Sequence, residues 1–461
     1  MTAPVIVWFR RDLRLADQPA LFAACGSGAP VIPVYVLDDE TPKHRKMGGA
    51  ARWWLHGSID ALSRALGRHN SRLILRRGSA AEVLASLAKE TGADAVHAIR
   101  HYEPWWRNAE RQLAEKVDLV LHDGNYLMPP GSVTTGSGDA YKIYTPFYRT
   151  ISRHLPAREP LPEPSLTLPG QWPDSDTLEG WQLEPTRPDW AGGMRKAWSR
   201  GESAAHDRLG EFLDVVDAYE SDRNLPSVDG SSRLSPHLHH GELSPSQIWS
   251  ALQGRRGAGV TSFRSELIWR DYAQNVIFQF PDYPSRNYRE RFDAFEWRDP
   301  ERDEDAAADL KAWQKGRTGY PIVDAGMRQL WATGWMHNRV RMIAASLLIK
   351  HLLIDWRHGE RWFWDTLVDA DYASNGVNWQ WVSGTGVDSN MFVRIMAPLS
   401  QSEKFDAAAY IREWVPELAD LPDADIHDPD GLLRPSNYPE KLIGHKEGRE
   451  RALAAYSRIK E

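Results

Sequence analysis

The first part of the chain alternates short runs of β-branched residues with stretches of helical periodicity, and this alternation constrains the fold more than any other feature of the sequence. The stretches between the runs are long enough for right-handed crossovers, which join parallel strands. We expect strands at residues 5–9, 31–37, 73–76, 95–99 and 119–122. The sequence therefore predicts an α/β domain with a parallel sheet over residues 1–127.

The rest of the chain has a different pattern. Residues 155–190 are rich in proline and polar residues, which exclude a long helix or a central strand. From about Gly192 the periodicity is helical, with long amphipathic segments at residues 262–280, 323–333 and 335–353. We therefore predict an extended linker over residues 128–195 and an all-α domain over residues 196–461.

Composition limits the chemistry that the chain can perform. Cys25 is its one cysteine, which excludes an internal disulfide and a cysteine-held iron–sulfur cluster, so redox chemistry requires an organic cofactor. Neither common phosphate loop is present, because no G-x-G-x-x-G follows the first strand and no G-x-x-x-x-G-K-[ST] occurs. H-E-x-x-H is missing too, and His237, His239 and His240 lack a companion carboxylate or cysteine at metal spacing, so we expect no metal site.

We expect a cytoplasmic protein that does not span a membrane. The longest apolar run, residues 343–356, is interrupted by Lys350 and His351 and is shorter than the about 18 apolar residues of a spanning helix. The chain opens with a strand-like run, not with an apolar signal segment. The net charge of −7 argues weakly against binding nucleic acid, but arginines gather between Arg317 and Arg361 and could form a local basic patch.

The strongest local signal is the string GWMHNRVRM at residues 334–342. In a helix, Asn338, Arg341 and Met342 stand at i, i+3 and i+4 and share one face. A stripe that faces an apolar core would not choose an amide and a guanidinium. The face therefore belongs either to a binding site or to a buried network in which Arg341 pairs with a carboxylate.

A second predicted helix carries Glu266, Trp269 and Arg270 at the same spacing. In a pocket, such a face could hydrogen-bond the edge of an extruded base and stack against it. The alternative is a surface helix with a salt bridge.

Two carboxylates and an amide, Asp369, Asp371 and Asn375, precede the pair Trp379 and Trp381. Acidic residues at this density are typical of a solvated loop or a metal site. The flanking aromatics argue instead for burial, and buried carboxylates need cationic or amide partners. The chain has 21 tryptophans, most of which should be core aromatics, while some could carry electrons.

The string SSRLS at residues 231–235 offers three hydroxyls just before a predicted helix. Hydroxyls and turn amides at such a point could hold phosphate oxygens. An ordinary serine helix cap is the alternative.

Taken in this order, the segments resemble the photolyase and cryptochrome family from Val5 to beyond Trp414. Within residues 312–355, the strings WQ at 313–314 and GRTGYPIVD at 316–324 are similar to the flavin-domain core of class I cyclobutane-dimer photolyases. The string RRDLR at residues 10–14 resembles the N-terminal opening of the family. The resemblance implies a Rossmann-like α/β N-terminal domain followed by an all-α FAD-binding domain.

The activity that the resemblance implies is light-driven electron transfer from reduced FAD, which splits cyclobutane pyrimidine dimers in DNA. Ser231 stands where the family usually has threonine, and the hydroxyl is retained. The implied FAD-binding positions are Tyr219, Ser231, Ser232, Arg233, Leu234, Ser235, Arg270, Asn338, Arg341, Asp369, Asp371 and Asn375.

Asn375 matches the residue that faces the reactive flavin nitrogen in the family. A neutral amide should not readily protonate the flavin radical, and plant cryptochromes, which resemble this segment, carry aspartate there. The resemblance at this position therefore favours repair over signalling.

The implied lesion contacts come from both strings with the i, i+3, i+4 pattern and from Trp381. Glu266 would hydrogen-bond the pyrimidine and stabilise charge as the electron arrives. Six-four photolyases show a histidine pair near Asn338, where this chain reads MHNR at 336–339, so we prefer the cyclobutane lesion. The full set of DNA and lesion positions is Arg223, Glu266, Trp269, Asn338, Arg339, Met342, Trp381 and Gln401.

Trp379, Trp356 and Trp297 match the family's chain of tryptophans that relays an electron to oxidised flavin; the interval after Trp297 holds an acidic stretch at residues 301–309. The resemblance also implies an antenna pigment in the N-terminal domain, which could be a deazaflavin, folate or a second flavin. Trp105 and Trp106 stand where folate-binding members carry polar contacts, which argues against folate as the antenna. The expected antenna contacts are Asp38, Arg52 and Glu103.

Two other functions stay open at this point. The first is a blue-light photosensor of the cryptochrome type without repair activity, which Asn375 and the lack of a long tail disfavour. The second is a light-independent flavin electron carrier, which leaves Glu266, Trp269 and Met342 unexplained. We expect a monomer whose partner is DNA that contains cyclobutane pyrimidine dimers.

Overall fold

The computed structural model describes residues 2–41, 43–389 and 392–459. They form two compact units, each built from three segments. Unit 1 comprises Met1–Ala191, Trp198–Asp214 and Ser232–Pro281, and unit 2 comprises Gly192–Ala197, Val215–Ser231 and Asp282–Glu461. These units follow the packing of the chain, and the predicted domain boundaries at residues 127 and 195 stay a prediction.

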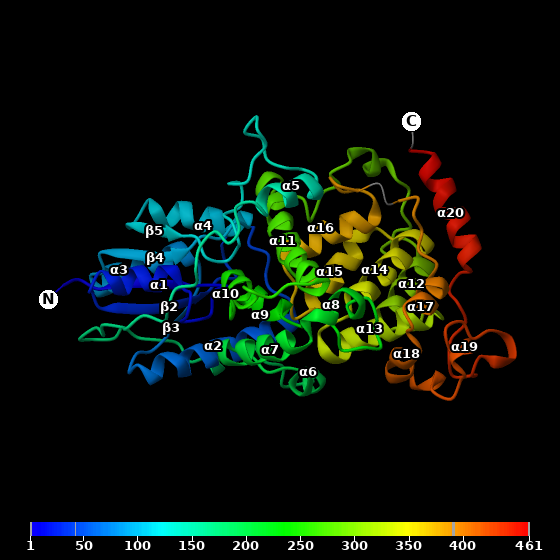
Figure 1. Cartoon of the computed structure of the whole chain (residues 1–461), viewed down its shortest axis with the longest axis horizontal. Coiled ribbons are helices and arrows are strands. Elements are labelled where there is room, and N and C mark those ends of the chain that lie inside the picture. Colours follow the sequence, from blue (N-terminus) through cyan, green and yellow to red (C-terminus); the bar gives the residue numbers. More distant parts are fainter. Residues whose placement is uncertain (1, 42, 390–391, 460–461) are drawn as a thin grey trace. The chain divides into compact units, whose positions relative to one another are not determined.

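Unit 1 contains a parallel sheet of five strands in the order β3-β2-β1-β4-β5 (Figure 1). This confirms the predicted parallel α/β fold, and four of the predicted strands have the observed bounds. The third starts and ends one residue later than expected. The strands are β1 (Val5–Phe9), β2 (Val31–Leu37), β3 (Ile74–Arg77), β4 (Ala95–Ile99) and β5 (Leu119–His122).

Helices connect these strands and continue beyond the sheet. The predicted extended linker contains one α-helix before its proline-rich part, α5 (Tyr144–Ile151), and ends in α6 (Gly192–Ala197), whose residues are in unit 2. The other α-helices with residues in unit 1 are α1 (Pro19–Gly26), α2 (Gly49–Arg68), α3 (Ala80–Thr91), α4 (Pro104–Ala114), α7 (Glu202–Val215), α9 (Ser235–His240), α10 (Pro245–Ala251) and α11 (Ala258–Gln279).

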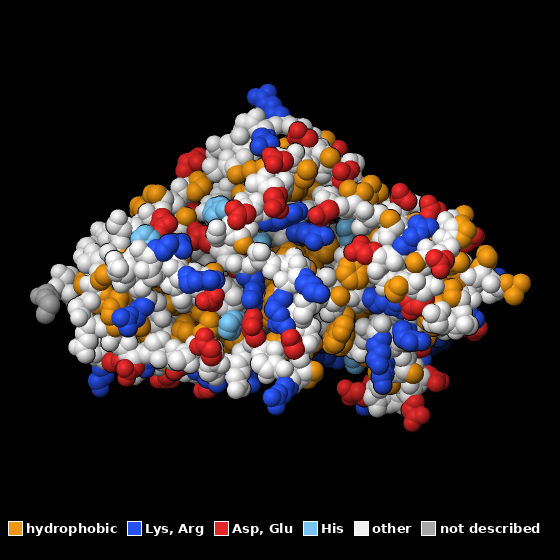
Figure 2. All heavy atoms as spheres, turned by 90° about the horizontal axis from the view of Figure 1, so that it is seen from below, with side chains coloured by type: hydrophobic (Ala, Val, Ile, Leu, Met, Phe, Trp, Pro, Cys, Tyr) orange, Lys and Arg blue, Asp and Glu red, His pale blue; other side chains and the backbone are white. Residues whose placement is uncertain are grey.

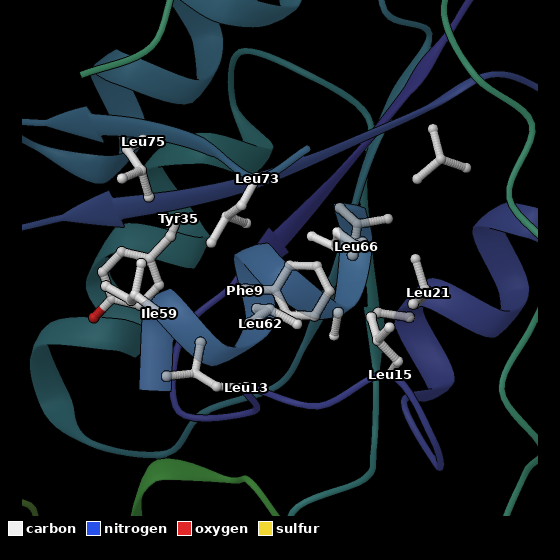
Figure 3. Packing of buried hydrophobic residues seen from close by; sticks show 14 of the residues in the cluster. Phe9, Leu13, Leu15, Leu21, Tyr35, Ile59, Leu62, Leu66, Leu73 and Leu75 are labelled. Carbon is white, nitrogen blue, oxygen red and sulfur yellow. The ribbon is translucent and has the colours of Figure 1, made fainter. Parts of the chain in front are cut away.

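The sheet is buried because helices cover it, as a parallel sheet requires. All residues of β1 and β2 are buried, which explains why both strands read as continuous apolar runs. Figure 3 shows Phe9 of β1 and Tyr35 of β2 packed with Ile59, Leu62 and Leu66 of α2. This apolar packing positions the ends of the strands, where the polar residues lie.

Among the described residues of unit 2, the regular elements are helices. One isolated β-bridge pairs Arg298 with Ile354. This confirms the predicted all-α character. Besides α6 and short 3-10 turns, the helices are α8 (Tyr219–Asp222), α12 (Glu304–Gln314), α13 (Pro321–Thr333), α14 (Asn338–Ser346), the π-helical η4 (Leu347–His351), α15 (Trp356–Thr366), α16 (Tyr372–Ser383), α17 (Pro398–Lys404), α18 (Ala408–Trp414), α19 (Asp423–Ile426) and α20 (His445–Ser457).

The predicted helix over residues 335–353 was wrong at its start. α13 ends at Thr333, and Gly334 follows in the left-handed region with φ of +70°, which favours glycine. His337 then caps α14, because its Nδ1 accepts a hydrogen bond from the Arg339 amide at 3.2 Å. The string at 334–342 is therefore a tight corner followed by the first turn of a helix, and Asn338 still begins the polar face.

In the part of the chain that the structure describes, no helix is long and apolar enough to cross a membrane. Figure 2 shows one face of the molecule, on which basic and acidic side chains lie intermingled. With a net charge of −7, local groups of arginines rather than the overall charge would attract an anionic partner.

Candidate functional site

A two-bond ion pair joins α14 to the loop before α16. Arg341 donates from Nη1 to Asp369 Oδ1 at 3.2 Å and from Nη2 to Asp369 Oδ2 at 2.9 Å. Its Nε donates to the Met336 carbonyl at 2.8 Å, inside the corner that precedes the helix. The Asp369 side chain is only 4% exposed, so it needs this cation. The predicted pairing of Arg341 with a carboxylate is confirmed.

The start of α16 positions Asn375. Asp371 caps this helix, since its Oδ1 accepts from the Ser374 amide at 2.7 Å. One turn into the helix, the Asn375 side-chain amide donates to the Glu360 carbonyl at 3.1 Å and to Glu360 Oε1 at 2.9 Å. The amide nitrogen is thus turned toward α15, and the amide oxygen is the atom that Asn375 can present to a ligand. Sequence reasoning missed Glu360, although it lies one turn after Trp356.

The predicted relay tryptophans lie on or near α15 and α16. Trp379 is buried, with its ring centroid 5.0 Å from that of Phe363 and 6.3 Å from that of Trp313. A Cβ on Gly359 would come within 2.1 Å of the Trp379 indole, so only glycine leaves room for this packing. Trp356 is buried and donates from Nε1 to Asn287 Oδ1 at 2.9 Å.

Trp297 is partly buried against Phe295, with ring centroids 4.2 Å apart. The next residue, Arg298, donates its amide to the Leu353 carbonyl at 2.8 Å, three residues before Trp356. The acidic stretch after Trp297 is the capped start of α12, because Asp303 accepts from the Ala306 amide at 3.0 Å. The path of electrons through the three tryptophans stays a prediction.

Arginines gather around the corner before α14. Arg339 donates to Asn224 Oδ1 and lies over the Phe405 ring at 4.5 Å. Burial and the neighbouring charges of Arg223 and Arg394 lower the pKa of Arg339. Its Nε is buried without a hydrogen-bond partner among the described residues. The sequence patterns identified neither Arg394 nor Asn224.

His337 experiences the same positive field. Burial first, and then the charges of Arg339, Arg341 and Arg223, lower its pKa to about 4. The imidazole is therefore neutral at physiological pH and can accept the capping hydrogen bond. This group of cations suits a phosphate oxygen.

On α11 of unit 1, Trp269 and Arg270 have partners other than carboxylates. The Trp269 indole stacks on the Tyr144 ring, with centroids 3.4 Å apart and planes 6° from parallel. Arg270 donates to the Asn125 carbonyl at 2.5 Å and to the Leu238 carbonyl at 3.4 Å, and its guanidinium lies 4.6 Å from the centre of the Tyr126 ring. Glu266 is half-buried one turn earlier. Sequence reasoning missed Tyr144.

The remaining predicted cofactor residues have simpler surroundings. Ser231 and Ser232 lie in an irregular segment before α9, in which Arg233 has a φ of +53°. The Leu234 amide donates to Ser232 Oγ at 3.4 Å, and Ser235 begins the helix. The helix after this segment is as expected, whereas the segment's role in phosphate binding stays a prediction.

The other predicted cofactor and DNA positions differ in their exposure to solvent. Tyr219 is buried beneath Arg223, whose guanidinium is 5.3 Å from the ring centre. Asn338 is exposed at the first position of α14. The half-buried positions are Met342, Trp381 and Gln401.

The expected antenna residues lie at the carboxyl edge of the sheet or on α2. Burial raises the pKa of Asp38, but hydrogen bonds from His44 and Thr41 outweigh it and hold the pKa well below its usual range. Glu103 forms an ion pair with Arg11. Arg52 donates to Asp39 Oδ1 at 2.6 Å. These residues have protein partners, and their contact with a pigment stays a prediction.

The histidine cluster has a carboxylate close to one of its members. His237 Nδ1 lies 2.5 Å from Glu242 Oε2, at hydrogen-bonding distance, while no group of three or more His, Cys, Asp or Glu side chains among the described residues could hold a metal ion. Glu242 also accepts from the Gly201 amide at 2.7 Å. Sequence spacing alone missed the pair because Glu242 follows the helix α9 and turns back on it.

Two family models match the chain. Residues 5–165 match DNA photolyase, and residues 263–458 match the FAD binding domain of DNA photolyase. The deoxyribodipyrimidine photo-lyase of Agrobacterium fabrum is 46% identical over an alignment that covers 100% of this chain and 99% of the relative.

The chain belongs to the photolyase and cryptochrome family.

A photolyase of Agrobacterium tumefaciens, whose crystal structure is described as class III, is 46% identical and superimposes with a TM-score of 0.94 over 100% of this chain and 98% of that one. The photolyase of Sulfolobus tokodaii, described with two FAD molecules, is 29% identical with a TM-score of 0.84, covering 99% of this chain and 100% of that one. Cryptochrome-1 of Sinapis alba is more distant, at 33% identity over 99% of this chain and 96% of the relative. The expected family and the expectation of a photolyase are both confirmed.

Proposed function

We propose that this chain is a deoxyribodipyrimidine photo-lyase that uses light to split cyclobutane pyrimidine dimers in DNA. The observation that carries the proposal is the polar arrangement on α14 and α16 of unit 2. There Arg341 is held by Asp369 in two hydrogen bonds, and Asn375 is held by Glu360. The neutral amide of Asn375 favours repair over a cryptochrome-type photosensor.

The donor set of unit 2 fits the edge of an isoalloxazine ring. Such an edge offers carbonyl oxygens, ring nitrogens and an N–H group, which a guanidinium, an amide and a carboxylate can bind. Arg341, Asp369 and Asn375 are these groups, and each already has a protein partner that fixes its orientation. Reduced FAD, when bound and excited by light, supplies the electron that splits the dimer.

The lesion side uses residues with other chemistry. The Trp269 indole gives a flat surface for a base, and Glu266 accepts or donates a hydrogen bond at the pyrimidine edge. In unit 2 the arginines around Arg339 suit phosphate oxygens of the DNA backbone. A dimer is cheaper to extrude than an intact base pair, because its stacking and pairing are already impaired.

The subtype and the antenna are less closely defined. The class I subtype expected from residues 312–355 stays a prediction, since the solved structure at 46% identity is described as class III. The antenna could be a deazaflavin, folate or a second flavin, with Asp38, Arg52 and Glu103 as contacts. The S. tokodaii photolyase with two FAD molecules supports a second flavin as one of these choices.

The decisive experiment incubates an oligonucleotide containing one thymine dimer with the reduced protein, in light and in darkness. We expect intact thymines to appear only in the light. A protein that binds FAD but restores no thymine would favour the photosensor. In the same preparation, Trp379→Phe should slow the light-driven reduction of oxidised flavin while pre-reduced enzyme still repairs.

A further inference from the structure

Tyr144, the first residue of α5, covers one face of the Trp269 indole. Its ring centroid is 3.4 Å from that of Trp269, and the planes are 6° from parallel. A stacked base needs a similar separation, so no base fits between these rings. A base can therefore stack on Trp269 only from the opposite side.

The Tyr144 ring is held from two directions. Its hydroxyl lies 2.7 Å from Ser265 Oγ and donates to the Ser265 carbonyl at 3.1 Å, one turn before Trp269 on α11. Tyr272 is buried and stands edge-on to both rings, 5.6 Å from Tyr144 and 5.5 Å from Trp269. Tyr272 itself donates to the Lys142 carbonyl at 2.8 Å.

α5 also packs on α11 through a second aromatic side chain. Phe147, the fully buried residue one turn later, packs against Tyr272 with centroids 5.7 Å apart. Tyr144 and Trp269 are both half-buried, so their pairing lies where a ligand can reach it. An aromatic stack at the edge of a site restricts the tilt and rotation of the ring that meets the ligand.

We propose that Tyr144 is a positioning residue for dimer recognition: it sets the plane of the Trp269 indole and confines the lesion to the opposite face. The inference rests on the proposed function, because Trp269 matters here as the platform for the extruded bases. The order gained before binding lowers the entropy that the lesion complex must lose. The sequence pattern that identified Trp269 contains no sign of Tyr144, which is 125 residues away by the numbering.

The test uses the reduced holoenzyme in darkness and measures dissociation constants for an oligothymidylate with one cyclobutane dimer and for its undamaged counterpart. Tyr144→Leu should weaken binding of the dimer by about three- to tenfold and leave the undamaged oligonucleotide nearly unchanged. Tyr144→Phe, which keeps the stack and loses the hydroxyl, should retain most of the affinity. Equal weakening with both oligonucleotides, or equal losses in the leucine and phenylalanine variants, would overturn the proposal.

Tyr148 provides the matched control. It lies one turn later on α5, and its ring meets Tyr144 at 5.8 Å with a tilt of 44°. Tyr148→Leu removes the same amount of aromatic surface from the same helix, and its dimer affinity should stay within about twofold of wild type. A loss as large as that of Tyr144→Leu would mean that α5 acts as general packing, which would overturn the proposal.

A double-mutant cycle isolates the pair. In a Trp269→Leu background, Tyr144→Leu should cause no further loss, because the ring that it positions is gone. If Tyr144→Leu weakens dimer binding by the same factor in both backgrounds, the proposal is wrong.

If Tyr144→Leu does not yield flavoprotein, Tyr144→His, which keeps a flat ring of smaller area, takes its place with a smaller expected loss of affinity. A wild-type protein that neither prefers nor repairs the dimer would refute the proposed function, whereas a repairing wild type with an unaffected Tyr144→Leu variant would refute this inference alone.

Discussion

α11 of unit 1 and α14 of unit 2 each carry functional residues at the i, i+3, i+4 spacing, including one arginine. The two arginines nevertheless have different kinds of partner. Arg341 on α14 has a carboxylate partner in two hydrogen bonds. Arg270 on α11 has two backbone carbonyls and an aromatic ring. One helix therefore buries an ion pair, and the other holds a charge with dipoles and a π-face.

The two arrangements differ in which substitutions each helix can tolerate. A buried carboxylate that loses its cation is left uncompensated, and this is expensive. A backbone carbonyl that loses its guanidinium partner loses one hydrogen bond, but it is neutral and leaves no uncompensated charge. α14 should therefore be sensitive to any change at its polar face, and α11 less so.

The largest effect is expected for Arg341→Leu. It leaves Asp369, 4% exposed, without its cation and should lower the free energy of unfolding by about 3 kcal/mol. FAD should be lost from the purified protein as well. Urea unfolding followed by circular dichroism, with flavin content from absorbance, checks both effects.

Arg270→Leu tests the other helix by the same measurements. The loss of two hydrogen bonds to carbonyls and of the contact with Tyr126 should lower the free energy of unfolding by about 2 kcal/mol. If this variant were less stable than Arg341→Leu, the contrast between dipoles and an ion pair would fail.

Asn375→Asp makes the polar face of unit 2 more acidic. The new carboxyl would face Glu360, so the pKa of the pair would rise in the folded state. A raised acid pKa means that the folded state binds more protons, so stability should fall as pH rises above about 4, with a cost of about 1–2 kcal/mol at about pH 8. Melting temperatures at about pH 5 and about pH 8 measure it.

Asn378→Asp is the control for this change. Asn378 lies on the same helix, is exposed, and donates to the Ser374 carbonyl at 2.7 Å. Its variant should show a small loss with little dependence on pH. Matching pH profiles for the two variants would show that the contact with Glu360 is unimportant.

The smallest effect concerns Asp271, next to Arg270 on α11. Burial raises its pKa to about 7, although hydrogen bonds from backbone amides and the charge of Arg270 oppose the rise. The stability associated with its protonated form is present at low pH and is lost as pH rises from about 4 toward 7.

Asp271→Asn should remove this loss and stabilise the protein by about 1 kcal/mol at about pH 8, with little gain at about pH 4. Melting curves at both values test the prediction, with the exposed Asp282→Asn as control. A gain that is equal at both values would contradict the assigned burial effect.

Much of the fold could be predicted because its signals are local. β1 and β2 are continuous apolar runs, and their predicted bounds match the structure. The corner at Gly334–His337 was missed, since a helical pattern of side chains continues across it while the backbone does not. The left-handed glycine and the capping histidine were both visible in the sequence, but only the backbone shows that they act together.

The candidate site was predictable to a smaller degree. The spacing identified Arg341 and Trp269, and the need of Arg341 for a carboxylate followed from the cost of burying charge. Glu360, Arg394 and Tyr144 were missed, because none of them belongs to a string with a recognisable pattern. Each interacts with a residue on another element, which no local window contains.

Local sequence was enough to predict which residues share a face and which segments form strands or helices, because periodicity and backbone sterics act over a few residues. Tertiary structure alone decided the partners. Arg341 meets Asp369 28 residues away, and Arg270 meets the carbonyl of Asn125 145 residues away. Contacts at such distances depend on the packing of whole elements, so identical spacings on α11 and α14 lead to different electrostatics.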